Sequence, residues 1–268
     1  MLAIILDNPA DRLVSALRLS SFKDFKIYIP AYNDSLTSEE DRLNVTIGTL
    51  RDVNEEWVIM LGNGAEPGKR VLGQLNRCIN SNPEFDVFHL NIEGEPKFPL
   101  KADAEKLFLK VFVKGAAAPL SAFAFRTRTL KEKIVRFEDG SIDPLATVIA
   151  CSGENKVRTV RWTKLIYNAP FENLTPEQAD EKTWKRIEFL RWSERFFGDE
   201  DYPLSVGKSF KLFAKEVAAL YPARSKDELK GIMDGFETVK GLLRKTMASQ
   251  ALKSAIKARS EAVSNPLG

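Results

Sequence analysis

Short apolar runs alternate with helical stripes along the first part of the chain. Residues 2–6 and 25–29 have strand length, and apolar side chains recur with helical spacing over residues 10–20 between them. The order repeats further on, with a strand predicted at residues 57–61, a helix at 71–79 and a strand within 82–90. Strand–helix–strand units place their strands parallel in one sheet, so the pattern predicts an α/β fold.

The pattern also divides the chain into two parts. Up to residue 168 it predicts further alternating elements: a short helix starting near Ser38, an edge strand over residues 43–47, a helix over 102–114, strands over 120–126 and 157–162, and a helix over 143–150. After residue 168 the chain is rich in charged and aromatic residues, with helical patterns over 175–197 and 204–262 and a linker candidate at 198–203. We therefore expect an α/β domain at residues 1–168 and a helical C-terminal extension at 169–268.

Composition narrows the class of protein. The 268 residues are 44% hydrophobic and 29% charged, as in soluble globular proteins. The formal charge of +3 does not indicate a nucleic-acid partner, and no apolar run approaches the roughly 20 residues that span a bilayer. The N-terminus has no basic segment before its apolar run, and two cysteines give neither a disulfide framework nor a zinc spacing. A cytoplasmic location is the expectation.

The single histidine, His89, excludes several kinds of site. It lies in a predicted buried strand, where a packed core histidine is the favoured interpretation. A zinc site made of several histidines is excluded, and a Ser-His-Asp site would have to use His89 without a nucleophile-elbow motif. Neither a Walker A nor a G-x-G-x-x-G sequence is present, so phosphate binding by those loops is not supported.

Polar side chains follow the first three predicted strands. In a parallel sheet, ligands bind at the carboxyl ends of the strands. The candidates for a ligand site there are Asp7, Asn8, Tyr32, Asn33, Asp34 and Asn63. Tyr32, Asn33 and Asn63 also have a simpler interpretation, because Tyr-Asn after proline and Asn-Gly are common in ordinary turns.

The order of these segments resembles the GT-A glycosyltransferases of the family 2 type over about residues 1–168. Their first strand and its polar end match residues 2–8. The aspartate pair that holds the nucleotide base in that family matches Ala31 and Tyr32, with Asp34 close by. Their Asp-x-Asp loop falls on Gly62-Asn63-Gly64, so both acidic positions are missing. The resemblance implies a GT-A fold, Rossmann-like, with a mostly parallel central sheet flanked by helices.

Later segments extend the resemblance. The string around Phe125-Arg126 matches a motif of the family, and the aspartate of its Glu-Asp pair falls on Asp143. Residues 188–192 resemble the Gln-x-x-Arg-Trp string of processive members. The resemblance implies transfer of a sugar from a nucleotide-diphosphate sugar to a hydroxyl of a glycan, lipid or protein acceptor, with Asp143 as general base. The alternative is that Asp143 only caps the helix that begins at Pro144.

The leaving diphosphate needs positive charge, which the resemblance implies comes from Mg²⁺ or Mn²⁺ on the Asp-x-Asp carboxylates. The missing motif argues against such a cofactor. Glu66 is a candidate metal ligand, although it is also a turn residue before Pro67. Basic side chains, Arg126, Arg128 or Lys69, are candidates to replace the metal, and solvated surface charges are the alternative.

Two other interpretations fit the same residues. In one, a GT-A-like domain has lost catalysis and acts as a binding or structural module in a larger assembly. In the other, the chain has an unrelated Rossmann-like fold.

In the extension, residues 240–259 form a basic amphipathic pattern. Such a helix either contacts an anionic membrane surface peripherally or docks on protein.

Overall fold

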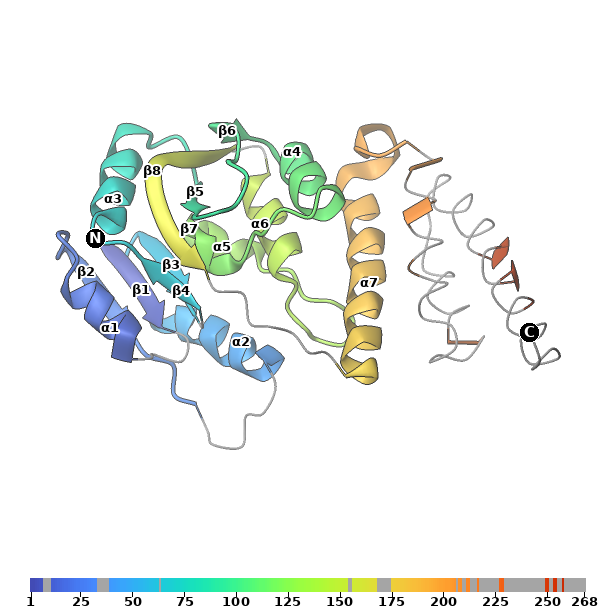
Figure 1. The fold of residues 1–268 in the computed structure, drawn as a ribbon, viewed down its shortest axis with the longest axis horizontal. Helices are drawn as coiled ribbons and strands as arrows, with labels where there is room; N and C mark the ends of the chain where they lie inside the picture. Colours follow the sequence, from blue (N-terminus) through green and yellow to red (C-terminus); the bar gives the residue numbers. More distant parts are fainter. Residues whose placement is uncertain are drawn as a thin grey trace. The chain divides into compact units, whose positions relative to one another are not determined.

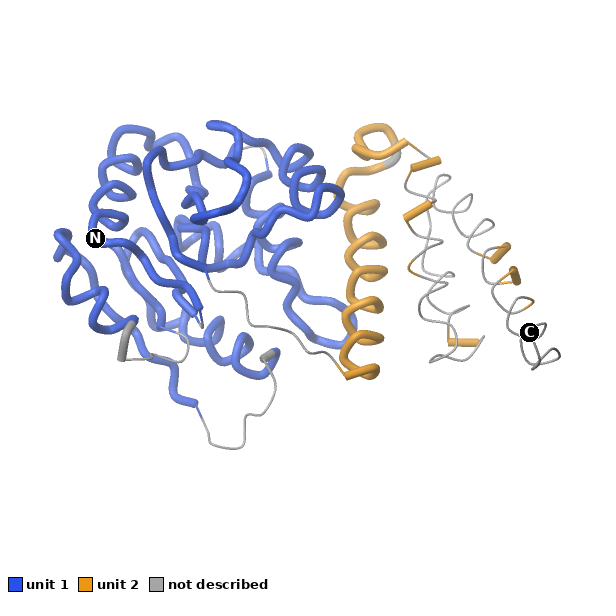
Figure 2. The backbone as a smooth tube through the Cα atoms, viewed as in Figure 1, with its two compact units in different colours: residues 1–171 blue, residues 172–268 orange. Residues whose placement is uncertain are grey.

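We obtained a computed structural model of the chain, which describes residues 1–6, 11–32, 39–62, 64–153, 156–167, 175–205 and, beyond these, residues 207–208, 211–212, 216, 227–228, 249–250, 253–254 and 257. The chain divides into two compact units, residues 1–171 and residues 172–268 (Figure 2). The first unit holds the sheet and carries the candidate site.

Within the described residues, eight strands form one mixed sheet (Figure 1). The strands are β1 (Leu2–Leu6), β2 (Phe25–Tyr28), β3 (Trp57–Leu61), β4 (Ala65–Pro67), β5 (Val87–Ile92), β6 (Lys101–Ala102), β7 (Phe123–Arg126) and β8 (Val157–Tyr167). Their order is β2-β1-β3-β7-β5-β8-β4, with β6 paired to β8. β1, β2, β3, β5 and β8 run in one direction, and β4, β6 and β7 run against it. The predicted α/β class, with a mostly parallel central sheet flanked by helices, is confirmed.

The helices of this unit are α1 (Asp11–Arg18), α2 (Glu39–Gly48), α3 (Val71–Ser81), α4 (Ala104–Phe108), α5 (Thr127–Lys133) and α6 (Pro144–Ser152). Short 3-10 turns follow α2 (Thr49–Asp52) and precede β7 (Leu120–Ala122), and a π-helical turn (Leu109–Val113) continues α4. α3 packs against β8, and α6 packs against both α4 and α5. The helices therefore bury the faces of the sheet.

The central strands are apolar on both faces because both faces are covered. All five residues of β1 and all five of β3 are buried, which is the pattern of parallel strands between helical layers. The two strands pair in register from Leu2↔Trp57 to Leu6↔Leu61, so they end at the same edge of the sheet. β2 ends beside them, with Ile5↔Tyr28 as its last pair. We call this the carboxyl edge, and the opposite edge, where β1, β3 and β5 begin, the amino edge.

Three sequence predictions differ from the structure. Residues 43–47, predicted as an edge strand, are helical and belong to α2, because Leu43, Ile47 and the buried Leu50 repeat at helical spacing. Residues 65–67, between the predicted strand at 57–61 and the predicted helix at 71–79, form the strand β4, which pairs with the distant β8. β8 itself continues five residues beyond the predicted end at Trp162, since it runs to Tyr167.

The second unit contains the long helix α7 (Pro176–Asp201). Thr175 and Gln178 form a capping box at its start, and Gly198 breaks the helical geometry near its end with a φ of 71°. The predicted helices after residue 204 lie largely outside the described residues, as does the basic pattern at residues 240–259. No helix in the described part of the chain is long and apolar enough to cross a bilayer.

Candidate functional site

The strands β1, β2 and β3 end together at the carboxyl edge. Because these three strands are parallel and in register, the segments after Leu6, Tyr28 and Leu61 leave the sheet at one edge. Four of the predicted ligand-binding segments follow directly: Asp7-Asn8, Tyr32, Asn33-Asp34 and Asn63. Of these, Asp7, Asn8, Asn33, Asp34 and Asn63 lie outside the described residues.

Tyr32 is the described member of this group. Its side chain is half-buried, and its hydroxyl lies 2.9 Å from Thr46 Oγ1 on helix α2. Its backbone N–H donates to Pro30 O at 3.1 Å, which makes the turn after β2 that the sequence suggested. Helix α2 therefore anchors Tyr32 beside the loops of the carboxyl edge.

The segment that carries Asp143 meets the same helix. Arg136 and Ile142 form an isolated antiparallel bridge, and Arg136 Nη1 donates to Asn44 Oδ1 of α2 at 2.8 Å. Asn44 and Thr46 are two residues apart on α2, so their side chains leave different sides of the helix. Tyr32 and the hairpin before Asp143 therefore both contact α2, but from different sides.

Asp143 is the N-cap of α6. Its Oδ1 accepts a 2.6 Å hydrogen bond from the Ala146 N–H, and its own N–H donates to Val135 O at 3.2 Å. The side chain is half-buried. The alternative prediction, that Asp143 caps this helix, is therefore confirmed, and the cap holds its carboxylate in a defined position at the helix start.

Glu66 lies on β4, opposite Ile166 of β8, and is half-buried. A hard divalent cation takes six or more oxygens, several of them charged. Among the described residues, no three acidic, histidine or cysteine side chains gather to hold a metal ion. The acidic side chains of the described residues therefore do not supply the several charged oxygens that Mg²⁺ or Mn²⁺ takes.

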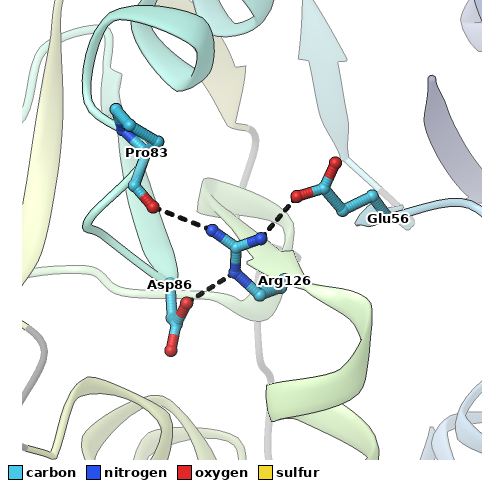
Figure 3. A network of polar contacts seen from close by, with 4 residues as sticks. All are labelled: Glu56, Pro83, Asp86 and Arg126. Carbon is cyan, nitrogen blue, oxygen red and sulfur yellow. Dashed lines mark hydrogen bonds and ion pairs between the residues drawn. The ribbon is translucent and has the colours of Figure 1, made fainter.

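Arg126 lies at the amino edge, the edge of the sheet opposite to the one that Tyr32 follows. It pairs with Trp57, the first residue of β3, in the β3–β7 ladder. Its guanidinium donates to Asp86 Oδ1 at 2.6 Å and to Pro83 O at 2.9 Å, and it forms an ion pair with Glu56 (Figure 3). Its Cζ lies 4.8 Å from the centre of the Trp57 ring. These contacts make Arg126 a structural tie, so the structure does not bring it together with the other candidates.

The other two cations proposed to replace a metal lie at different ends of the sheet. Arg128, the second residue of α5, forms an ion pair with Glu132 at 2.8 Å and is exposed. It follows directly on β7 and so lies on the amino side with Arg126. Lys69 comes two residues after Pro67, whose partner Leu165 pairs with the last residue of β5, and its carbonyl accepts the Ser21 N–H at 3.2 Å.

His89 is a core residue, as predicted. It lies on β5 with its ring 4.1 Å from that of Phe98 and 5.0 Å from that of Phe123. Neither ring nitrogen has a hydrogen-bond partner. Burial lowers the pKa of His89 from 6.5 to about 3, so the imidazole is neutral.

The sequence interpretation assigned no role to Thr46, Asn44 or Arg136. Their importance comes from contacts across 14 and 92 positions of the chain, which no local motif reports. The one available signal was the helical spacing of Leu43, Ile47 and Leu50, which would have placed Asn44 and Thr46 on a helix.

The fold is that of a GT-A-like domain. The chain is similar to the structure of S. aureus TarS, a GT-A glycosyltransferase, with a TM-score of 0.52 and 11% identity, covering 97% of this chain and 55% of that chain. It is also similar to residues 1–349 of S. aureus TarS in complex with UDP-GlcNAc, with a TM-score of 0.54 and 10% identity, covering 97% of this chain and 92% of that chain. No family model matches the sequence, and no curated protein matches it. The chain thus spans about half the length of the longer TarS chain.

Proposed function

We propose that this protein binds a nucleotide-diphosphate sugar at the carboxyl edge and transfers the sugar to an acceptor hydroxyl. The observation that supports it most is that Tyr32, which follows β2, and the hairpin before Asp143 both contact helix α2. The structural likeness to a TarS fragment in complex with UDP-GlcNAc suggests a uridine diphosphate sugar as donor. The acceptor is a glycan, lipid or protein hydroxyl.

In this proposal Asp143 is the general base. The acceptor oxygen forms a bond to the anomeric carbon while the bond from that carbon to the diphosphate oxygen breaks. The hydroxyl proton passes to the Asp143 carboxylate and then to solvent, and the diphosphate leaves with the bonding electron pair. The N-cap bond from Ala146 fixes the carboxylate, which favours an in-line arrangement.

A second candidate function is a GT-A-like module that binds a ligand without catalysis. The two functions differ in whether positive charge must lie near the leaving diphosphate. The positions of Arg126 and Arg128 on the amino side favour that second function, because neither cation is near the proposed donor. Positive charge near a leaving diphosphate is a requirement of transfer.

Donor binding is the first test. We expect UDP and UDP-GlcNAc to raise the melting temperature of the full chain, since one site at a hundred times its dissociation constant adds about 2.7 kcal/mol of stability. The melts are measured with and without Mn²⁺ over a panel of nucleoside diphosphates. If no member of the panel shifts the transition, the donor site does not exist and the non-catalytic module is favoured.

Asp143→Asn is the second test, and Asp103→Asn is its matched control. Asp103 caps α4 just as Asp143 caps α6, with its Oδ1 accepting the Lys106 N–H at 2.8 Å. Asparagine is also a good N-cap, so both variants keep their helices. We expect Asp143→Asn to lose turnover with donor affinity nearly unchanged, and Asp103→Asn to keep both. Equal losses of turnover and affinity in Asp143→Asn would show that its role is structural.

A further inference from the structure

Trp162 combines an exposed side chain with a strained backbone conformation. Its side chain is 82% exposed, and it is the one non-glycine residue of the described chain with a positive φ, 66°. A bulky residue in the left-handed region is a true outlier that costs free energy. Burial does not compensate this cost, because the indole lies in solvent. Neither packing nor backbone geometry therefore explains a tryptophan at this position.

A hydrogen-bonded bulge holds Trp162 in place. The pairing of β5 with β8 changes register between Leu90 and Ile92, opposite this residue. The buried Thr163 hydroxyl accepts the Asn91 N–H at 3.0 Å and donates to Val160 O at 3.0 Å, and Asn91 Nδ2 donates to the same carbonyl at 3.2 Å. These three hydrogen bonds hold the backbone of the bulge, and with it Trp162, in one conformation.

The exposed residues near Trp162 in β8 are charged. Arg161 is exposed next to it, and Lys164 Nζ forms an exposed ion pair with Glu93 at 3.0 Å. Stable protein interfaces bury several hundred square ångströms per partner around an apolar centre, which one ring among charges does not provide. A sugar ring fits better, because it has one face of C–H groups for the indole and hydroxyls at its rim for the charged neighbours.

The position along β8 indicates where the sugar would bind. β8 curves strongly through this region (Figure 1), and its residue Leu165, three positions after Trp162, pairs with Ile92, the last residue of β5. β5 runs in the same direction as β3, so the bulge that carries Trp162 lies toward the carboxyl ends of the parallel strands. We propose, on the basis of the function proposed above, that Trp162 is a stacking platform for a pyranose unit of an oligosaccharide acceptor.

The test compares the full-length chain with Trp162→Gly and Leu19→Ala. Glycine accepts the positive φ without strain, so Trp162→Gly removes the ring while keeping or raising the melting temperature. Leu19→Ala is the control, since Leu19 is another exposed large apolar residue, 68% exposed, at the end of α1. The probes are chitotetraose, cellotetraose and laminaritetraose, with binding measured by calorimetry and by saturation-transfer NMR.

We expect at least one tetrasaccharide to bind the wild-type chain. Trp162→Gly should weaken that binding about tenfold or more, the loss expected for one aromatic stack, and Leu19→Ala should leave it unchanged. The proposal is overturned if no tetrasaccharide binds, or if Trp162→Gly binds as the wild type does. It is also overturned if the variant instead loses affinity for UDP-GlcNAc or abolishes a self-association seen by sedimentation. If a tetrasaccharide binds through Trp162 but UDP-GlcNAc does not bind at all, the proposed transfer reaction is wrong and the sugar-stacking role of Trp162 is retained.

Discussion

His89 shows how a titratable residue serves the core of this fold rather than its chemistry. The side chain is 1% exposed, and two phenylalanine rings lie against it. Burying a neutral imidazole with no hydrogen-bond partner for either nitrogen costs about 1–3 kcal/mol of lost hydration, which the packing of the ring must offset. Protonation inside this apolar site is strongly unfavourable.

This burial predicts a pH dependence of stability with a definite sign. The pKa of His89 is lowered to about 3 in the folded state from the 6.5 of a solvated imidazole, so the unfolded chain takes up the proton first as the pH falls. Stability is therefore complete above pH 6.5 and is lost below it. We expect a loss of about 1.4 kcal/mol at pH 5.5 and about 2.7 kcal/mol at pH 4.5 from this residue.

Urea unfolding of the wild type and of His89→Leu between pH 4.5 and 7.5 measures this loss. Leucine has a similar volume and does not titrate, so the difference between the two curves isolates His89. Parallel curves over this range would mean that His89 is hydrated or paired in solution, and the prediction would fail.

At the scale of elements, sequence periodicity predicts the long strands and helices, whereas the short strands depend on pairing with distant parts of the chain. β1, β3 and α3 were predictable because each is long enough for its burial pattern to appear in the sequence. β4 has three residues with Glu66 and Pro67 among them, and it exists only because Pro67 and Ala65 find partners on β8, about a hundred positions later. Local propensity carries no information about such a pairing.

The same limit applies to the candidate site. That polar loops follow β1, β2 and β3 could be predicted from the strand order, because parallel strands end together. The location of Arg126 could not, because it depends on β7 running against its neighbours. An antiparallel strand exchanges the two edges, so the residue at its carboxyl end lies at the amino edge.

Arg126 should contribute to stability through this placement. It ends β7 and bonds to Asp86, just before β5, and to Glu56, just before β3, so it ties three strands at one edge (Figure 3). Removing it leaves the partly buried Asp86 without this cation. We expect Arg126→Ala to lower the free energy of unfolding by about 2–4 kcal/mol.

Chemical denaturation tests this, with Arg128→Ala as the matched control. Arg128 is 85% exposed and pairs only along its own helix with Glu132, so its removal should not shift the midpoint measurably. Arg126→Lys should recover part of the loss, because lysine keeps the charge but not the fork that reaches several acceptors. Equal midpoints for the two alanine variants would contradict a structural role for Arg126.

At the scale of the whole molecule, the first unit has the properties of a domain. Every strand of the sheet and every helix from α1 to α6 lies within residues 1–171, and the buried side chains of β1, β3, β5 and β7 form a core there. A chain of this length buries enough apolar surface to fold by itself. The carboxyl edge and Asp143 also lie within these residues.

We therefore expect residues 1–171, expressed alone, to unfold cooperatively and to bind UDP as the full chain does. The two measurements answer different questions. A cooperative melt shows that the core is complete, because a unit missing part of its core exposes apolar surface and melts broadly. A UDP-dependent rise in melting temperature equal to that of the full chain shows that the donor contacts are complete as well. If the fragment melts cooperatively but UDP no longer stabilises it, residues 172–268 must supply donor contacts, and the proposed site would have to include them.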